Sequence, residues 1–191
     1  MMIIRAASLD DAAGIRGIRN AAVRDTLAVW TEREQTPEQA VAWLEPAVTR
    51  GTALVAVERH PPGTGTGDGI PPHDDRIIGF AVAVPWRAYE GYARTVEDSV
   101  YLSPTAQGRG VGGRLLAALI DASRRAGDRT MIAAIEAGND ISIHLHERHG
   151  FVVVGTIPAA GEKHGRLLDL TLMSRALRVP PPMPDASSYF R

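Results

Sequence analysis

The sequence predicts a single mixed α/β domain. Short apolar runs rich in β-branched residues, which are typical of strands, alternate along the chain with amphipathic helical patterns. No internal repeat occurs, and the predicted order is strand, two helices, three strands, helix, strand, helix and two strands. The 191 residues are enough for one domain with a sizeable core. We therefore expect a domain over 1–177 and a proline-rich tail over 178–191.

The first strand and the first helix are predicted close to the amino terminus. An apolar run at 2–7 predicts the strand. Ser8, followed by Asp11 three residues later, resembles a capping box, which opens a helix. We expect this helix to run through about Val23.

The second helix has a sharper start signal. Thr36 can cap the helix, Pro37 occupies the first helical position, and Gln39 completes a capping box. The pattern predicts a helix that ends near Val48.

Six further apolar segments predict the other strands of the sheet. They lie at 52–58, 76–84, 95–102, 130–136, 151–157 and 167–173. The segment 59–75 is dense in glycine and proline and has almost no apolar residue, so it predicts a flexible hairpin loop. We assign no function to that loop.

Two more helices follow the fourth predicted strand. A glycine-rich stretch opens the first, and Leu115 and Leu119 share one face of a helix that ends near Ala126. Asn139 is a plausible cap for the second, a short helix that ends before Gly150, which suits a helix terminus.

Composition and charge exclude several classes of protein. The formal net charge is −1, which does not favour nucleic acid as a partner. No cysteine is present, so disulfides, thiolate metal sites and cysteine nucleophiles are excluded. The first residues do not resemble a signal peptide, and no apolar run is long enough to cross a membrane. We therefore expect a cytoplasmic protein.

The stretch "AQGRGVGGRLL" at 106–116 predicts an anion-binding loop. Glycines that open a helix present backbone N–H groups and the positive end of the helix dipole to a phosphate. A nucleotide-binding P-loop requires a lysine after the glycines, which is absent here.

A dinucleotide-binding fingerprint is a second interpretation of the same loop. Gly108, Gly110 and Gly113 match its spacing, and Glu136 ends the next strand. However, the segment "SPTAQ" separates the glycines from the preceding strand, and three strands come before it. Both features disfavour this interpretation.

The third interpretation uses Gln107, Gly110 and Gly112, which fit the pattern [QR]-x-x-G-x-[GA]. This loop resembles that of the GNAT superfamily of N-acetyltransferases, in which it wraps the pyrophosphate of acetyl-coenzyme A (acetyl-CoA). The resemblance implies a mostly antiparallel mixed sheet of about seven strands, with a splay between the fourth and fifth strands, flanked by about four helices.

The resemblance also implies which residues hold acetyl-CoA, without a metal. The pantetheine arm is expected in the splay, where its amides pair with exposed strand backbone and the Asn139 side chain. The predicted coenzyme-binding residues are Val100, Tyr101, Leu102, Gln107, Gly108, Arg109, Gly110, Val111, Gly112, Gly113 and Asn139.

Longer segments resemble one branch of that superfamily, the phosphinothricin and methionine sulfone acetyltransferases. The segment "PWRAYEGYARTVEDSVYLSPTAQGRGVG" and the shorter "PEQ", "GND", "LHERHGF" and "AAGEKHGRLLDL" occur in the order of that branch. The resemblance covers most of 2–177 apart from 59–75. It implies acetyl transfer to a small primary amine by direct attack, and often a homodimer, for which the C-terminal strands offer a pairing surface.

Glu97 and His146 match the catalytic glutamate and histidine of the branch. An α-amino group has a reference pKa of about 7.7–8.0, so it needs a base before it can attack the thioester. We expect Glu97 to accept the amine proton and His146 to act on the sulfur side, although the two roles can be exchanged. Histidines 144, 146 and 149 do not form the H-E-x-x-H zinc motif, and no metal site is predicted.

The acceptor pocket should offer cations and aromatic walls to an amino-acid-like molecule. By comparison with the corresponding positions of the branch, the predicted acceptor-binding residues are Trp30, Trp86, Arg87, Tyr92, Lys163 and His164. The chain departs from the branch at Thr31, Tyr89 and Arg94, which favours a related amino acid or another small amine over a herbicide-like acceptor. Acetylation of a protein N-terminus or lysine, and an acetyl-CoA-binding regulatory module without turnover, remain as alternatives.

Overall fold

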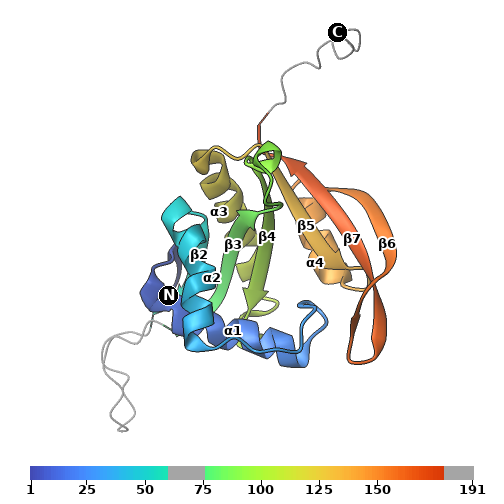
Figure 1. Ribbon diagram of the computed structural model, residues 1–191. Helices are drawn as coiled ribbons and strands as arrows, with labels where there is room; N and C mark the ends of the chain where they lie inside the picture. Colours follow the sequence, from blue (N-terminus) through green and yellow to red (C-terminus); the bar gives the residue numbers. More distant parts are fainter. Residues whose placement is uncertain (60–75, 179–191) are drawn as a thin grey trace.

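The computed structural model describes residues 1–59 and 76–178. In these ranges a seven-stranded sheet has the strand order β1-β2-β3-β4-β5-β7-β6. Helices α1 and α2 cover one face of the sheet, and α3 and α4 lie on the other (Figure 1). The predicted element order and the mostly antiparallel mixed sheet are confirmed.

The strands are β1 Met2–Ala6, β2 Ala53–Glu58, β3 Arg76–Pro85, β4 Thr95–Leu102, β5 Thr130–Glu136, β6 Val152–Lys163 and β7 Arg166–Ala176. The α-helices are α1 Ala12–Asp25, α2 Pro37–Arg50, α3 Val111–Ala126 and α4 Asp140–Arg148. Three short 3-10 turns, η1 Leu9–Asp11, η2 Glu90–Tyr92 and η3 Pro104–Ala106, join them. The predicted loop at 59–75 and tail at 178–191 lie outside the described residues, apart from Arg59 and Arg178.

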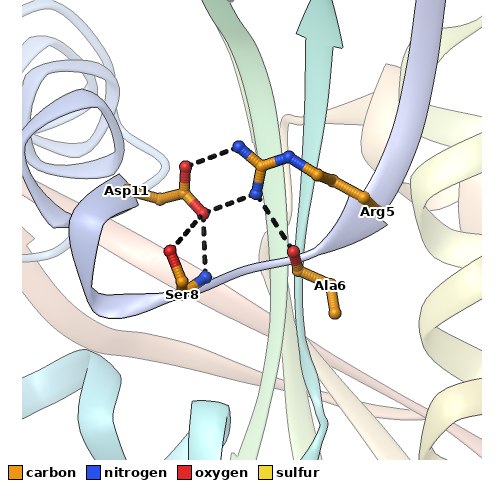
Figure 2. Close-up of polar contacts among 4 residues, drawn as sticks. All are labelled: Arg5, Ala6, Ser8 and Asp11. Carbon is orange, nitrogen blue, oxygen red and sulfur yellow. Dashed lines mark hydrogen bonds and ion pairs between the residues drawn. The ribbon is translucent and has the colours of Figure 1, made fainter.

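Asp11 organises the start of the first helix (Figure 2). Its Oδ2 atom accepts the backbone N–H of Ser8 at 2.8 Å, as the predicted capping box requires. The guanidinium of Arg5 contacts both carboxylate oxygens of Asp11, at 2.7 and 2.8 Å. Burial alone would raise the pKa of Asp11, but the hydrogen bonds from Arg5 and Ser8 hold it below its usual value.

The second helix begins as its sequence predicts. The Gln39 N–H donates to Thr36 Oγ1 at 3.3 Å, and Gln39 Oε1 accepts the Thr36 N–H at 3.0 Å. The helix ends at Gly51, which has a left-handed backbone conformation with φ of 71°. The reciprocal hydrogen bonds between Thr36 and Gln39, at the start of α2, fix where the loop between α1 and α2 ends.

The core has one apolar layer on each face of the sheet. Leu115, Leu119 and Met131 belong to the layer under α3 and α4. Leu44 and Phe80 belong to the layer under α1 and α2. Because side chains alternate along a strand, successive residues of β4 belong to opposite layers.

The parallel pairing between β4 and β5 is short. Residues 95–97 of β4 pair with 130–132 of β5, and no further pair joins the two strands, although both continue. Beyond Glu97 the strands therefore diverge, as Figure 1 shows. The predicted splay between the fourth and fifth strands is confirmed.

The last two strands are longer than the sequence predicts. β6 continues six residues beyond the predicted end at Ile157, through a register shift between Ile157 and Gly161. Ala159 has a positive φ of 48°, and its N–H donates to Asp169 Oδ1 at 2.7 Å. The residues that follow the predicted end of the strand form a bulge inside a long hairpin. No helix in the described ranges is long and apolar enough to span a membrane.

Candidate active site

The glycine loop connects the end of β4 to the start of α3. Gly108 and Gly110 have positive φ angles of 71° and 72°. The first helical hydrogen bond runs from the Arg114 N–H to the Gly110 carbonyl at 3.3 Å, so the amides that precede it have no partner in the helix. The loop therefore offers an anion a row of backbone donors at a helix N-terminus.

Glycine is required in this loop for its backbone conformation. A Cβ atom added at Gly108 or Gly110 would have no heavy atom within 4 Å, so crowding does not select glycine. The left-handed conformation does select it, because other residues are strained there. Open space in front of the loop leaves room for the anion.

The side chains of the predicted coenzyme loop have different roles. The Arg109 guanidinium binds Glu58 at 2.8 Å and the Thr105 carbonyl at 3.1 Å, which ties the loop to the end of β2. Gln107 is exposed, and the Val111 side chain is buried in the core. Val111 can therefore meet a ligand only through its backbone.

A pocket occupies the splay between β4 and β5. Six of its polar lining residues are Asp98, Tyr101, Glu136, Asn139, Ser142 and His146. Val100, Tyr101 and Asn139, which the sequence predicts to hold the coenzyme, all line it. Asn139 also caps α4, because its Oδ1 accepts the Ser142 N–H at 3.1 Å. Leu102 is different, since it packs against Gly79 in the core.

Glu97 lies at the closed end of the splay, at the last paired position of β4. It is half-buried. Burial and the negative charge of Asp98 raise its pKa, and the positive charge of Arg87 opposes them. A carboxylate with a raised pKa is a better match for a proton taken from an amine.

His146 of α4 is buried on the face of the sheet opposite to the Glu97 side chain, with 4% of its surface exposed. Its Nδ1 atom lies 2.7 Å from the Ser142 carbonyl, and its Nε2 atom lies 3.0 Å from Asp98 Oδ2. Phe151 packs edge-on against the ring. Burial lowers the pKa of His146, but the hydrogen bond and charge of Asp98 and the Ser142 carbonyl outweigh it, so the pKa is raised.

Asp98 is a site residue that our sequence reasoning missed. The signal was present, because an acidic residue at an alternating position between Val96 and Val100 must either face the core or break the pattern. A buried acid needs a partner, and here the partner comes from a helix 48 residues later in the chain.

The acceptor residues predicted from the sequence fall into two groups. The first lies between β3 and β4, where the Trp86 and Tyr92 rings are 5.3 Å apart and the Arg87 guanidinium covers Trp86 at 4.4 Å. These residues lie at the end of the sheet where β4 begins (Figure 1).

The second group lies at the other end, where the turn between β6 and β7 contacts the loop between α1 and α2 (Figure 1). The Lys163 ammonium donates to the carbonyls of Val23, Thr26 and Val29 at 2.6–2.8 Å. Trp30 packs on Gly161 and donates its indole N–H to Leu27, and the His164 N–H donates to Glu32 at 2.9 Å.

Lys163 is therefore not a free cation for an acceptor carboxylate. Its side chain is 1% exposed, and its three N–H donors meet three carbonyls. It anchors the loop between α1 and α2, and Ala28 of that loop lines the pocket in the splay. The structure thus does not bring the six predicted acceptor residues together around one point.

Two other histidines, His144 of α4 and His149 just after it, lie outside the pocket in the splay. His144 is exposed and His149 is half-buried, and each contacts a backbone carbonyl of α4. Within 1–59 and 76–178, no three His, Cys, Asp or Glu side chains are placed to hold a metal ion.

The site thus combines three features. An anion-binding loop lies beyond the C-terminal end of β4, a narrow pocket runs between the strands, and ionisable groups occupy both faces of its closed end. This arrangement suits a phosphate-bearing carrier that extends into the splay and delivers a reactive group at its apex. The free amides, the open space at the glycines and the unpaired β4 backbone all fit acetyl-CoA.

Comparisons with known proteins agree with this reading of the site. The model of the acetyltransferase (GNAT) family matches residues 21–151. A methionine sulfoximine and methionine sulfone acetyltransferase of Salmonella typhimurium is 39% identical over 176 residues, which are 92% of this chain and 95% of that protein. An L-amino acid N-acyltransferase of Escherichia coli is 38% identical, with 92% and 94% covered.

A solved structure shares the fold and carries the coenzyme. It is a phosphinothricin acetyltransferase of the GNAT superfamily from Sinorhizobium meliloti in complex with acetyl-CoA. The TM-score is 0.81 and the identity is 30%, over 98% of this chain and 97% of that chain. Together with the family match, this shows that the chain belongs to the GNAT family of acetyltransferases.

Proposed function

We propose that this enzyme transfers the acetyl group of acetyl-CoA to the primary amine of a small amino-acid-like acceptor. The acceptors we propose are methionine sulfone, methionine sulfoximine, phosphinothricin or a related amino acid. One observation carries the proposal: a relative named for the first two acceptors is 39% identical along nearly the whole chain. The apex of the splay supports it, because Glu97 lies there with a raised pKa.

The coenzyme would be held by backbone more than by side chains. The amides of 108–113 would bind its pyrophosphate, because they precede the first helical bond of α3. The backbone of Val100 and its neighbours does not pair with β5, so it would bind the amides of the pantetheine arm. The Asn139 side chain would contact that arm from the cap of α4.

The chemistry needs a base on the nitrogen and stabilisation on the sulfur. The acceptor amine must lose a proton to attack the thioester carbonyl, and Glu97 would accept it directly or through a water. The leaving group is a thiolate, whose conjugate acid in cysteine has a reference pKa of about 8.5, and His146 would act on that side. Both groups adjoin the apex, on opposite faces of β4.

A homodimer belongs to the same proposal. β6 forms the edge of the sheet, and Val152, Val154 and Ile157 on it are exposed. Two copies can pair these edges about a twofold axis. The predicted cytoplasmic location stays a prediction, which fractionation of the source cells would test.

The first experiment measures thiol release from acetyl-CoA against methionine sulfone, methionine sulfoximine, phosphinothricin and the common amino acids. We expect selective, saturable turnover of an amino acid of this kind. Turnover of peptides with a free N-terminus or lysine, and of none of the small amines, would favour a protein acceptor. Acetyl-CoA binding without thiol release for any amine would favour a regulatory module.

A further inference from the structure

We propose that Asp98 is a positioning residue that keeps His146 doubly protonated, so that the His146 imidazolium stabilises the departing thiolate and Glu97 is the base. This inference rests on the proposed acetyl transfer, and it decides between the two assignments that the sequence left open. Neither the sequence pattern nor the family resemblance named Asp98.

The hydrogen bonds of His146 determine where its protons lie. The Ser142 carbonyl, 2.7 Å from Nδ1, can only accept, so Nδ1 must carry a proton. The Ser142 hydroxyl is farther from the same atom, at 3.5 Å. The contact of 3.0 Å between Nε2 and Asp98 Oδ2 then requires a second proton, because a bare nitrogen and a carboxylate would repel each other.

Burial makes this second proton hard to lose. The side chains of His146 and Asp98 are 5% and 1% exposed. The other carboxylate oxygen of Asp98, Oδ1, is also buried and has no hydrogen-bond partner among the described residues. His146 is thus the donor that balances the charge of Asp98, and loss of the shared proton would leave a buried, uncompensated carboxylate.

The other ionisable groups near the ring do not replace Asp98. Tyr101 of β4 lines the same pocket, and burial raises the pKa of its hydroxyl, so it stays neutral. Glu136 of β5 accepts the Gly138 N–H from its own loop at 3.0 Å. Glu97 faces the opposite layer, and Phe151 contributes only a ring edge.

The position of the pair relates it to the reacting atoms. Asp98 follows the last residue of β4 that pairs with β5, so the pair lies at the apex of the splay on the α4 face. Glu97, one residue earlier, lies at the same apex on the other face. A thioester that reaches the apex would therefore have a base on one face and an imidazolium on the other.

The proton and electron movements balance in this arrangement. The amine lone pair forms the new C–N bond at the thioester carbonyl, and Glu97 accepts a proton from the nitrogen. When the C–S bond breaks, its electron pair leaves on sulfur as a thiolate, which the positive charge of the His146 imidazolium stabilises and which then takes a proton from solvent. The ring keeps both of its protons throughout, donated to the Ser142 carbonyl and the Asp98 carboxylate. A doubly protonated imidazole has no lone pair, so His146 cannot be the base.

The variant Asp98→Asn removes the charge that keeps His146 doubly protonated and preserves the packing of the Asp98 side chain. An amide of nearly the same size can donate its N–H to a bare Nε2, so the contact survives while the acidic proton is lost. At saturating substrates we expect kcat to fall by roughly 10²-fold, the usual scale for loss of a group that stabilises a developing charge. Acetyl-CoA affinity should stay within about twofold, because Asp98 acts through His146 and holds no phosphate.

The pH profile gives a readout that a purely structural role would not move. His146 must be doubly protonated to stabilise the thiolate, so kcat of the native enzyme should fall as pH rises through its raised pKa. Without the Asp98 carboxylate that pKa drops, and the falling limb should move to lower pH. A matched control is Asp128→Asn, which removes a buried carboxylate paired with Arg50 at 2.5 Å outside the pocket. It should lower stability and leave the pH profile unchanged.

A second measurement uses the native protein and does not depend on turnover. The ¹⁵N chemical shifts of the His146 ring, assigned with His146→Gln, should show both nitrogens protonated at neutral pH. A neutral ring would overturn the proposal. An unchanged falling limb in Asp98→Asn would also overturn it, while acetyl transfer by the native enzyme would still support the proposed function. Absence of transfer to every acceptor would overturn both.

Discussion

Two adjacent carboxylates of β4 have different environments. Glu97 is half-buried and has only the distant charge of Arg87 to oppose the rise in its pKa. Asp98 is fully buried and has the His146 imidazole at hydrogen-bond distance. A carboxylate with a raised pKa and no ion pair can take up a proton, which suits Glu97 to the role of a base, whereas Asp98 is held against His146. Because side chains alternate along β4, Glu97, the proposed base, and Asp98, the partner of the His146 imidazolium, lie on opposite faces of the strand.

Glu97→Gln tests the base. We expect kcat to fall by about tenfold or more, because the amide cannot accept the amine proton. In the native enzyme the rate should rise with pH through the raised pKa of Glu97, since only the ionised form is a base, and the variant should lose this limb. Steady-state kinetics against pH would measure both effects. Glu147→Gln, an exposed change on α4, is the control; equal turnover of the two variants would remove Glu97 from the mechanism.

Lys163 is the only lysine of the sequence, which allows a direct test of its burial. Burial lowers its pKa, with Glu32 opposing, and its ammonium is fully hydrogen-bonded. We expect an amine-acetylating reagent to label only the amino terminus of the native protein, and Lys163 as well after unfolding. Mass spectrometry of the digested protein would locate the label. Fast labelling of Lys163 in the native state would contradict its burial and would restore Lys163 as a candidate cation for the acceptor carboxylate.

The sequence predicts residues whose partners are close along the chain. Thr36 caps α2 and Asn139 caps α4, and each cap joins residues three positions apart. Asp98 and Lys163 could not be predicted in this way, because their partners are separated from them by 48 and at least 134 residues. The alternation of β4 indicates that Asp98 faces the core, but only the packing of α4 and of the β6–β7 turn shows which groups Asp98 and Lys163 contact.

At the scale of elements, the start of α3 depends on Gly110. Its φ of 72° is left-handed, so alanine would be strained by roughly 1–2 kcal/mol, although nothing would clash with the added Cβ. We expect Gly110→Ala to weaken acetyl-CoA binding by about tenfold, because relief of that strain tilts the amides away from the phosphates. Isothermal titration calorimetry would measure the affinity.

Gly51 offers a control of the same geometry. It ends α2 with a φ of 71° and has equally open space. Gly51→Ala should therefore cost similar stability and leave acetyl-CoA affinity unchanged. If both variants lost affinity equally, the effect would come from stability alone, and the loop would not bind the coenzyme as we propose.

The β6–β7 hairpin shows why strand ends are hard to predict. The predicted strand ends at Ile157, and Pro158, Ala159 and Gly161 follow its apolar run. In the structure the pairing resumes at Gly161, where a larger side chain would collide with Trp30. The contact with a distant tryptophan, rather than local propensity, selects the glycine and extends the strand. The hairpin thereby reaches the loop between α1 and α2.

At the scale of the whole molecule, the coenzyme and acceptor regions differ in how well the sequence predicted them. The coenzyme region is built from backbone next to a local glycine motif, which a sequence displays directly. The acceptor candidates come from loops at both ends of the sheet, and their relation depends on how those loops pack. Trp86, Arg87 and Tyr92 form one compact group between β3 and β4, whereas Lys163 and His164 contact the loop between α1 and α2.

The edge of the sheet leads to a prediction about assembly. β6 is an edge strand whose Val152 and Val154 are 63% and 65% exposed, a combination that single chains usually avoid because it invites pairing. We expect the protein to sediment as a dimer at micromolar concentration, with the two β6 strands adjacent. Val154→Glu should shift it to monomer, because the twofold axis brings the two charges close together. Val41→Glu makes the same substitution at an exposed position of α2, away from β6, and should leave the dimer intact. A native protein that sediments as a monomer over the whole concentration range would contradict pairing, and the exposed valines would then need another partner.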